Sequence, residues 1–198
     1  MKRFYVILLL LLSISSSIFA DDINRKGFYI GVAQGNVDFE DDGLSDDYSP
    51  YGGNYNSDGL DDGTKLYFGM QFNGIIGLEG GYTQYGEFGT SLGITEYTAT
   101  NLGLNLGVSF LSSQLRPFIN LGISVIEADL KSSSYTVYTI EDTAVGFHYG
   151  IGFQYEPNVL RGVGFRVALE RDLFRQEIND DSYNQTLEMM YVGVQYKF

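Results

Sequence analysis

The sequence lacks cysteine and contains only three prolines and one histidine. Without cysteine, disulfides, zinc–thiolate sites, catalytic thiols and a lipidated N-terminal cysteine are excluded. Scarce proline beside 25 glycines and 15% aromatic residues excludes a proline-rich stalk and fits the close interior of a small barrel. Basic residues are also few: 12 against 25 acidic ones give a net charge of −13, which disfavours nucleic acid and anionic lipid as electrostatic partners.

Long apolar runs are absent after the first 20 residues, whereas a helix that spans a membrane needs ~20 apolar residues. Residues 1–20 have the order of a secretory signal peptide, with Lys2 and Arg3, an apolar run over 4–12, and then small and polar residues. Cleavage would remove two basic residues and no acidic one, so the net charge would change from −13 to −15. We expect residues 21–198 to form one domain that enters a membrane, if at all, as strands.

The C-terminal segment 185–198 alternates strictly between two faces. Successive side chains of a strand point to opposite sides, so one side of this segment is apolar throughout. An unpaired terminal edge strand frays and invites aggregation, and pairing with the first strand would remove that edge. The segment therefore predicts a closed barrel, with these residues on its apolar face: Met190, Val192, Val194, Tyr196 and Phe198.

Seven further segments alternate in the same way. One face of each is almost uninterruptedly apolar, whereas the other carries mainly glycine, serine, threonine and asparagine. We predict an all-β fold, an eight-stranded antiparallel up-and-down transmembrane β-barrel, with strands at about 26–37, 64–73, 75–85, 96–110, 115–127, 142–155, 162–173 and 185–198.

The composition of the two faces predicts that the apolar faces point outward into lipid. A face in contact with bulk water normally carries many charges, whereas small polar residues suit a crowded lumen. A soluble barrel with the opposite orientation is the alternative. Up-and-down winding also brings a set of aromatic residues to one rim, as an interfacial girdle requires: Phe28, Phe72, Phe110, Tyr155, Phe165, Tyr196 and Phe198.

The predicted connections alternate in length. Short turns follow the second, fourth and sixth strands, at Asn73 and Gly74, at 112–114 and at 156–158. Asn-Gly is a two-residue hairpin signal because both residues tolerate a positive φ. Longer polar loops follow the other strands, the first being the acidic segment 38–63. Short periplasmic turns and long outer loops are typical of outer-membrane barrels.

The chain end also resembles the C-terminal signal of bacterial outer-membrane barrels, through Gly193, Tyr196 and Phe198. The whole mature chain resembles the small eight-stranded barrels of the OmpA membrane domain, OmpX and the opacity-type surface proteins. The resemblance implies an outer-membrane location reached through the periplasm, reading of this signal by the barrel-insertion machinery, and contact with membrane lipid and lipopolysaccharide. It rests on no catalytic motif.

The charges predicted to face the lumen carry both signs. An eight-stranded barrel is just wide enough to be filled by its own side chains, so a structural network is expected, with a gated ion path as the alternative. We assign to the lumen polar network Lys65, Glu79, Arg116, His148, Arg166 and Glu170, and Lys197 has the same phase.

Catalysis is not expected. Barrel enzymes that modify lipids need a histidine with a serine on the lipid-facing surface, whereas His148 has the phase of the lumen and no adjacent serine. The acidic segment contains Asn54 to Gly59, which is similar to the start of a calcium loop. The twelfth position is Lys65 where a glutamate is required, so no specific metal or cofactor site is predicted. Weak divalent-cation bridging between this loop and lipopolysaccharide phosphates stays open.

Together these features predict a monomeric, non-enzymatic outer-membrane protein with a surface-antigen or adhesin-like role through its outer loops. A small channel and a lipid-modifying enzyme are the alternatives.

Overall fold

The computed structural model describes residues 26–40, 62–90, 93–110, 114–131, 141–178 and 181–198. The predicted signal peptide 1–20, most of the acidic loop 38–63 with its calcium-loop-like segment, and residues 112–113 of one predicted turn lie outside this part of the chain. Among the described residues, no helix is long and apolar enough to cross a membrane.

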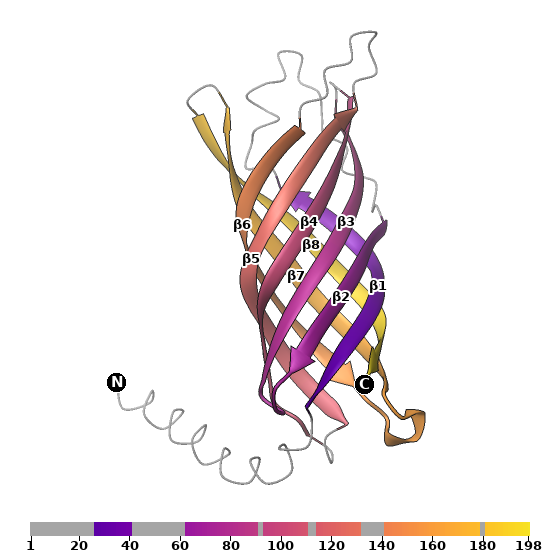
Figure 1. Ribbon diagram of the computed structural model, residues 1–198. Coiled ribbons are helices and arrows are strands. Elements are labelled where there is room, and N and C mark those ends of the chain that lie inside the picture. Colours follow the sequence, from indigo (N-terminus) through magenta and orange to yellow (C-terminus); the bar gives the residue numbers. More distant parts are fainter. Residues whose placement is uncertain (1–25, 41–61, 91–92, 111–113, 132–140, 179–180) are drawn as a thin grey trace, which may run out of the picture.

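Eight antiparallel strands form one closed barrel, because each strand pairs with its neighbour in sequence and β8 pairs with β1 (Figure 1). Closure confirms the predicted fold class. The strands are β1 (Gly27–Glu40), β2 (Asp62–Gln71), β3 (Ile76–Thr90), β4 (Gly93–Gly107), β5 (Leu115–Lys131), β6 (Glu141–Tyr155), β7 (Val163–Ile178) and β8 (Asp181–Lys197), with a short 3-10 helix, η2 (Asn158–Leu160), between β6 and β7.

The register of the strand pairs fixes the tilt of the barrel. A row of directly paired residues that starts at Phe28 returns to β1 at Asp38, ten residues further along the strand. With eight strands about 4.8 Å apart and a rise of about 3.3 Å per residue, this shear tilts the strands by about 40°. Such a barrel leaves only enough interior for side chains.

The apolar faces point outward, as predicted. The exposed fraction is 46–62% for Ile30, Leu102 and Ile123, far above that of ordinary core residues. The chain end, the connections 72–75 and 156–162, and residues 108–110 after β4 lie at one end of the barrel, called here the turn end (Figure 1). The aromatic residues predicted for the girdle are all exposed at this end: Phe28, Phe72, Phe110, Tyr155, Phe165, Tyr196 and Phe198.

At the opposite end, called here the loop end, two predicted long loops are wrong. Strands β3 and β4 continue to Thr90 and Gly93, and β7 and β8 continue to Ile178 and Asp181. Only residues 91–92 and 179–180 therefore separate these pairs. The prediction failed because it ended each strand where the apolar alternation stops, whereas backbone pairing continues beyond that point.

The prediction of a two-residue hairpin at Asn73 and Gly74 is also wrong. The connection runs over residues 72–75, and among the described residues only Gly86, Arg161 and Gly162 have a positive φ. The Asn73 side-chain oxygen accepts hydrogen bonds from the backbone N–H groups of Ile75 and Ile76, at 2.8 and 2.7 Å. Asparagine thus shapes this turn through its side chain, as in an Asx turn.

Close strand contact at one glycine pair generates a prediction. Gly103 of β4 is paired with Gly122 of β5, and a Cβ on either residue would lie under 3.0 Å from backbone atoms of the other strand. We expect Gly103→Ala to lower the free energy of unfolding by about 1–3 kcal/mol, because overpacking forces the backbone to shift. Urea unfolding in vesicles measures the loss. Gly77→Ala is the matched control, since its nearest atom would be 3.2 Å away; an equal loss in both variants would contradict the explanation.

Candidate functional site

The lumen near the turn end contains charged side chains contributed by five strands. The residues predicted for the lumen polar network lie close together and are all at most 5% exposed: Lys65, Glu79, Arg116, His148, Arg166 and Glu170. Lys197 lies apart from them at the rim, where its ammonium group donates to Gln71 at 2.6 Å and lies 3.6 Å from Glu156.

Glu79 of β3 and Arg166 of β7 form the central ion pair. The two guanidinium NH groups of Arg166 donate to the two carboxylate oxygens of Glu79, at 2.8 and 2.7 Å. Tyr29 donates a third hydrogen bond to this carboxylate, at 2.5 Å. The guanidinium plane lies over the rings of Tyr67 and Phe118, with its carbon 4.2 and 4.6 Å from the centroids. Cation–π contact and bidentate pairing together fix the position of Arg166.

Glu170 of β7 forms a second centre. Its carboxylate is 2.7 Å from the Lys65 ammonium group and accepts hydrogen bonds from Tyr191 at 2.8 Å and Asn120 at 2.9 Å. Asn120 also donates to Glu79 at 2.9 Å. One amide group therefore joins the two buried carboxylates into a single network.

His148 lies between two carboxylates. Its Nδ1 atom is 2.9 Å from Asp172, and its Nε2 atom is 3.7 Å from Glu170. Asp172 also accepts a hydrogen bond from Tyr85. The sequence analysis missed Asp172, although it lies two residues beyond Glu170 on the same face of the predicted strand 162–173. Its phase could have identified it.

Arg116 connects the network to the end of the barrel. Its guanidinium group donates to the backbone carbonyls of Gly74 and Ile75, at 3.2 and 3.3 Å, and to the side chain of Asn105 at 2.5 Å. Asn105 in turn donates to Asn120 at 2.7 Å. The β2–β3 turn is thereby tied to the centre of the lumen.

The network is balanced in charge when His148 is neutral. Burying an unpaired charge is costly, and mixed signs with hydrogen bonds to every carboxylate remove most of that cost. The three cations are Lys65, Arg116 and Arg166, and the three anions are Glu79, Glu170 and Asp172.

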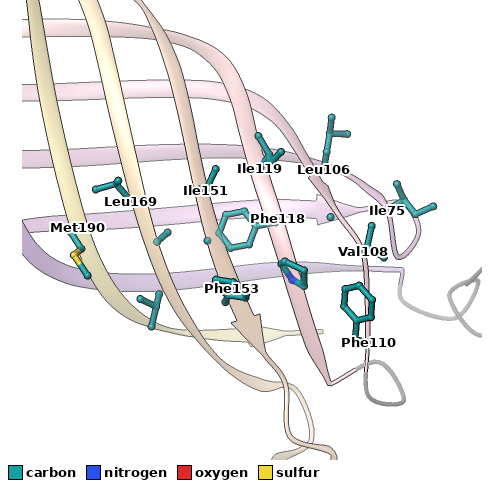
Figure 2. A pocket seen from close by; sticks show the side chains of 15 residues that line it. Ile75, Leu106, Val108, Phe110, Phe118, Ile119, Ile151, Phe153, Leu169 and Met190 are labelled. Atoms are coloured by element: carbon teal, nitrogen blue, oxygen red, sulfur yellow. The ribbon is translucent and has the colours of Figure 1, made fainter. Parts of the chain in front are cut away.

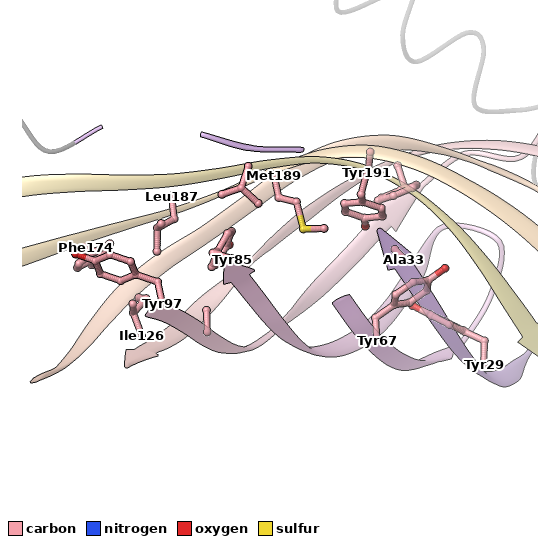
Figure 3. Close-up of a cluster of buried hydrophobic side chains, with 14 residues drawn as sticks. Tyr29, Ala33, Tyr67, Tyr85, Tyr97, Ile126, Phe174, Leu187, Met189 and Tyr191 are labelled. Atoms are coloured by element: carbon pink, nitrogen blue, oxygen red, sulfur yellow. The ribbon is translucent and has the colours of Figure 1, made fainter. Parts of the chain in front are cut away.

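Toward the loop end the lumen is filled by apolar and aromatic side chains, which we call the plug (Figure 3). The Phe39 and Tyr97 ring centroids are 5.1 Å apart, and those of Tyr97 and Phe174 are 6.4 Å apart. The sequence predicted inner faces of mainly glycine, serine, threonine and asparagine, whereas here large apolar and aromatic side chains predominate, beside the buried Gln185 and Thr95. The plug comprises Val37, Phe39, Tyr97, Ala99, Ile126, Phe174, Leu187 and Met189.

No set of residues with a catalytic or metal-binding arrangement is found in the part of the chain that the structure describes. Both ring nitrogens of His148 face the carboxylates of Asp172 and Glu170, and neither is directed at a hydroxyl group. No group of three acidic or histidine side chains there could hold a metal ion.

On the outer wall, a groove of about 680 Å³ has only apolar side chains and glycines in its lining, among them Ile119, Ile151 and Phe153 (Figure 2).

The residues of the C-terminal signal lie at the closing seam. Phe198 donates its backbone N–H to the Phe28 carbonyl at 2.9 Å, and its side chain is 76% exposed. The Tyr196 and Phe198 rings meet edge to face with centroids 5.1 Å apart. Gly193 is paired with Ala33 of β1.

Removal of one charge from the central pair generates a second prediction. We expect Glu79→Gln to lower the free energy of unfolding by about 3 kcal/mol, because Arg166 would be left as an uncompensated buried cation. Urea unfolding in micelles measures the loss, with the exposed Glu127→Gln as control, which should change stability by less than about 0.5 kcal/mol. The double variant Glu79→Gln/Arg166→Gln should lose less than the sum of its single losses. Additive losses would contradict the pairing.

Comparison with known proteins gives one family and several solved structures that share the fold. A family model described as "Outer membrane protein beta-barrel domain" matches residues 6–198. No curated protein sequence matches the chain. Among solved structures, Neisserial surface protein A is similar with 15% identity and a TM-score of 0.60, covering 87% of this chain and 97% of that one.

Two further solved structures share the fold. The outer membrane protein OprG of Pseudomonas aeruginosa has 14% identity and a TM-score of 0.54, with 86% of this chain and 96% of that chain covered. The attachment invasion locus protein Ail of Yersinia pestis, solved in complex with the heparin analogue sucrose octasulfate, has 18% identity and a TM-score of 0.50, with 86% and 97% covered.

Proposed function

Because this chain belongs to the outer membrane protein β-barrel domain family and so lies in the outer membrane, we propose that it is a non-enzymatic surface barrel with a closed lumen. In this proposal its turn end faces the periplasm, and its loop end contacts other molecules outside the cell. Residues 1–20 serve as the signal peptide. The barrel is monomeric, and the insertion machinery reads Gly193, Tyr196 and Phe198.

The observation that carries the proposal is the double closure of the lumen. A cation or anion that crossed the barrel would meet the network, in which every charge already has a partner at hydrogen-bonding distance. It would then meet the plug, which is lined mainly by apolar and aromatic side chains such as Ile126, Phe174 and Leu187. Moving an ion through such an apolar layer costs its hydration without compensation. This arrangement supports a structural interior over a channel.

The same arrangement disfavours a lipid-modifying enzyme. A lipid substrate approaches the outer wall, whereas His148 is 3% exposed and is held in the lumen by Asp172. The outer groove has no nucleophile or base in its lining. Because both ring nitrogens of His148 face carboxylates, neither is directed at a serine hydroxyl from which it could take a proton.

The loop end is suited to contact because its strands continue past the apolar belt. It is acidic: Glu96 of β4 is paired with Asp129 of β5, and like charges in direct opposition repel. Asp38, Glu40 and Asp62 are exposed at the described ends of the first loop. Ail was solved with a polysulfated ligand, but an acidic loop end repels such polyanions. We therefore propose cationic partners, or divalent cations that bridge the loops to lipopolysaccharide phosphates.

Electrical recording tests the closed lumen. We expect the purified protein to give no steady single-channel steps in planar bilayers, because the network and the plug block conduction independently. The plug variant Tyr97→Ala/Phe174→Ala should remain closed, since the network persists. Heat-modifiable gel mobility serves as the control for folding. Steady, reproducible steps from the folded wild-type protein would contradict the proposal and favour a channel.

Surface labelling tests the orientation. We expect a peptide epitope inserted within residues 41–61 to bind antibody on intact cells, because this connection joins β1 and β2 at the loop end. An epitope inserted after Asn158, in the β6–β7 connection, should bind only after the outer membrane is permeabilised. The two insertions are matched, since both lie in connections between strands. The reverse pattern would place the loop end in the periplasm and refute the contact role.

A further inference from the structure

The height of each outward-facing residue along the barrel axis can be calculated because the register of the strands is known. A row of paired residues climbs ten residues over eight strands, which is about 1.25 residues per strand, and at a tilt of about 40° each residue rises about 2.5 Å along the barrel axis. Every outward residue can therefore be placed at a height above Phe28, the lowest apolar residue of β1.

At the turn end, the apolar belt has a level edge. Phe72 of β2, Tyr155 of β6 and Tyr196 of β8 all come within about two residues, or ~5 Å, of the height of Phe28. A level edge is what a flat membrane interface requires.

At the loop end the edge is not level. On β5 and β6 the outward apolar residues continue to Val125 and Val145, about 23–26 Å above Phe28. That height matches an apolar belt of about 25 Å. On β1 and β2 the last outward apolar residues are Val32 and Leu66, at only about 10–13 Å.

Polar side chains fill most of the missing part of the belt, at heights of about 15–22 Å, with the exposed Met190 of β8 among them as the partner of Asn36. Gln34, Asn36 and Thr64 are exposed on the outer wall, and the Arg171 side chain is 43% exposed beside Glu188, with which it forms a salt bridge. These five residues are brought together by the pairing of β7, β8, β1 and β2. We call them the β1 notch.

Amide and guanidinium groups cannot remain in hydrocarbon without polar partners. The β1 notch is open toward the loop end, because the next outward residues on β1 are Asp38 and Glu40, and Gln34 itself donates to Asp62 at 3.4 Å. In Figure 1, β1 and β2 also end lower than β3 to β6. Polar groups can thus reach the notch from above without crossing an apolar wall.

We propose that the polar headgroups of outer-leaflet lipid descend into the β1 notch and bind it, so that the membrane is thinner beside β8, β1 and β2 than beside β5 and β6. Phosphate and ester oxygens are acceptors for Arg171 and for the Gln34 and Asn36 amides. The inference rests on the outer-membrane location and is independent of what the loops contact.

Spin labelling tests the proposal, and the absence of cysteine makes single labels specific. Asn36→Cys and Val125→Cys carry a nitroxide on nearly opposite strands, in dimyristoylphosphatidylcholine vesicles. Position 36 is the lower of the two, at about 20 Å against about 23 Å, so a uniform membrane would bury it more deeply. We expect the reverse. The nitroxide at position 36 should collide with a water-soluble nickel reagent at a rate about threefold or more higher than the nitroxide at position 125.

Three outcomes would overturn the proposal. Equal accessibility at the two positions, or the order expected for a uniform membrane, would mean that headgroups do not descend. Low accessibility of position 36 to both nickel and oxygen, with spin–spin broadening, would mean that a second copy covers the notch. The third outcome concerns the variant Gln34→Leu/Asn36→Leu. We expect this variant to raise the urea midpoint of unfolding in dioleoylphosphatidylcholine vesicles but not in thinner dilauroylphosphatidylcholine vesicles. An equal effect in both would exclude a thickness mismatch.

Discussion

The hydrogen-bonded seam between β8 and β1 is the constraint on which the rest of the structure depends. In hydrocarbon every backbone N–H and C=O group needs a partner within the protein, and an open sheet edge would leave a row of them unpaired. The seam supplies these partners over twelve residue pairs, from Tyr29 with Lys197 to Glu40 with Thr186. Closure also fixes the shear at ten residues, and the shear decides which inward side chains meet.

The buried network is a direct consequence of that register. Glu79 and Arg166 are separated by 87 residues and belong to strands that are not neighbours, yet the tilted barrel brings them to bidentate contact across the lumen. A different shear would oppose different side chains and leave charges without partners. The network is therefore a lock on the register as well as a filler, since a slipped barrel would bury unpaired charges.

Strands, faces and closure could be predicted from the sequence because each depends on a local pattern of period two. The inward phase of Lys65, Glu79 and Arg166 follows from that pattern alone. Their pairing does not, because the shear is a property of all eight strands together. The plug was missed for a related reason: Tyr97 and Phe174 lie where the outer face becomes polar, so the usual contrast between faces is reversed there.

The loop lengths were misjudged because apolar alternation was taken as the limit of each strand. Alternation records where a strand contacts lipid, whereas pairing depends on the backbone and continues without it. The extensions of β3 and β4 to Thr90 and Gly93 show this separation. Asn73 illustrates another limit, since its side chain and not its backbone φ closes the turn.

The separation of pairing from lipid contact also explains how one barrel can have a belt of unequal height. Pairing keeps β1 in register up to Glu40, so the barrel wall stays intact whether its outer side chains are apolar or polar. The outer surface is then free to vary: β5 stays apolar to Val125, whereas β1 becomes polar at Gln34. Because strand pairing does not depend on the apolar belt, a low edge of that belt costs no backbone hydrogen bond. The lipid bilayer deforms more easily than the barrel, so the bilayer adapts its thickness to that edge.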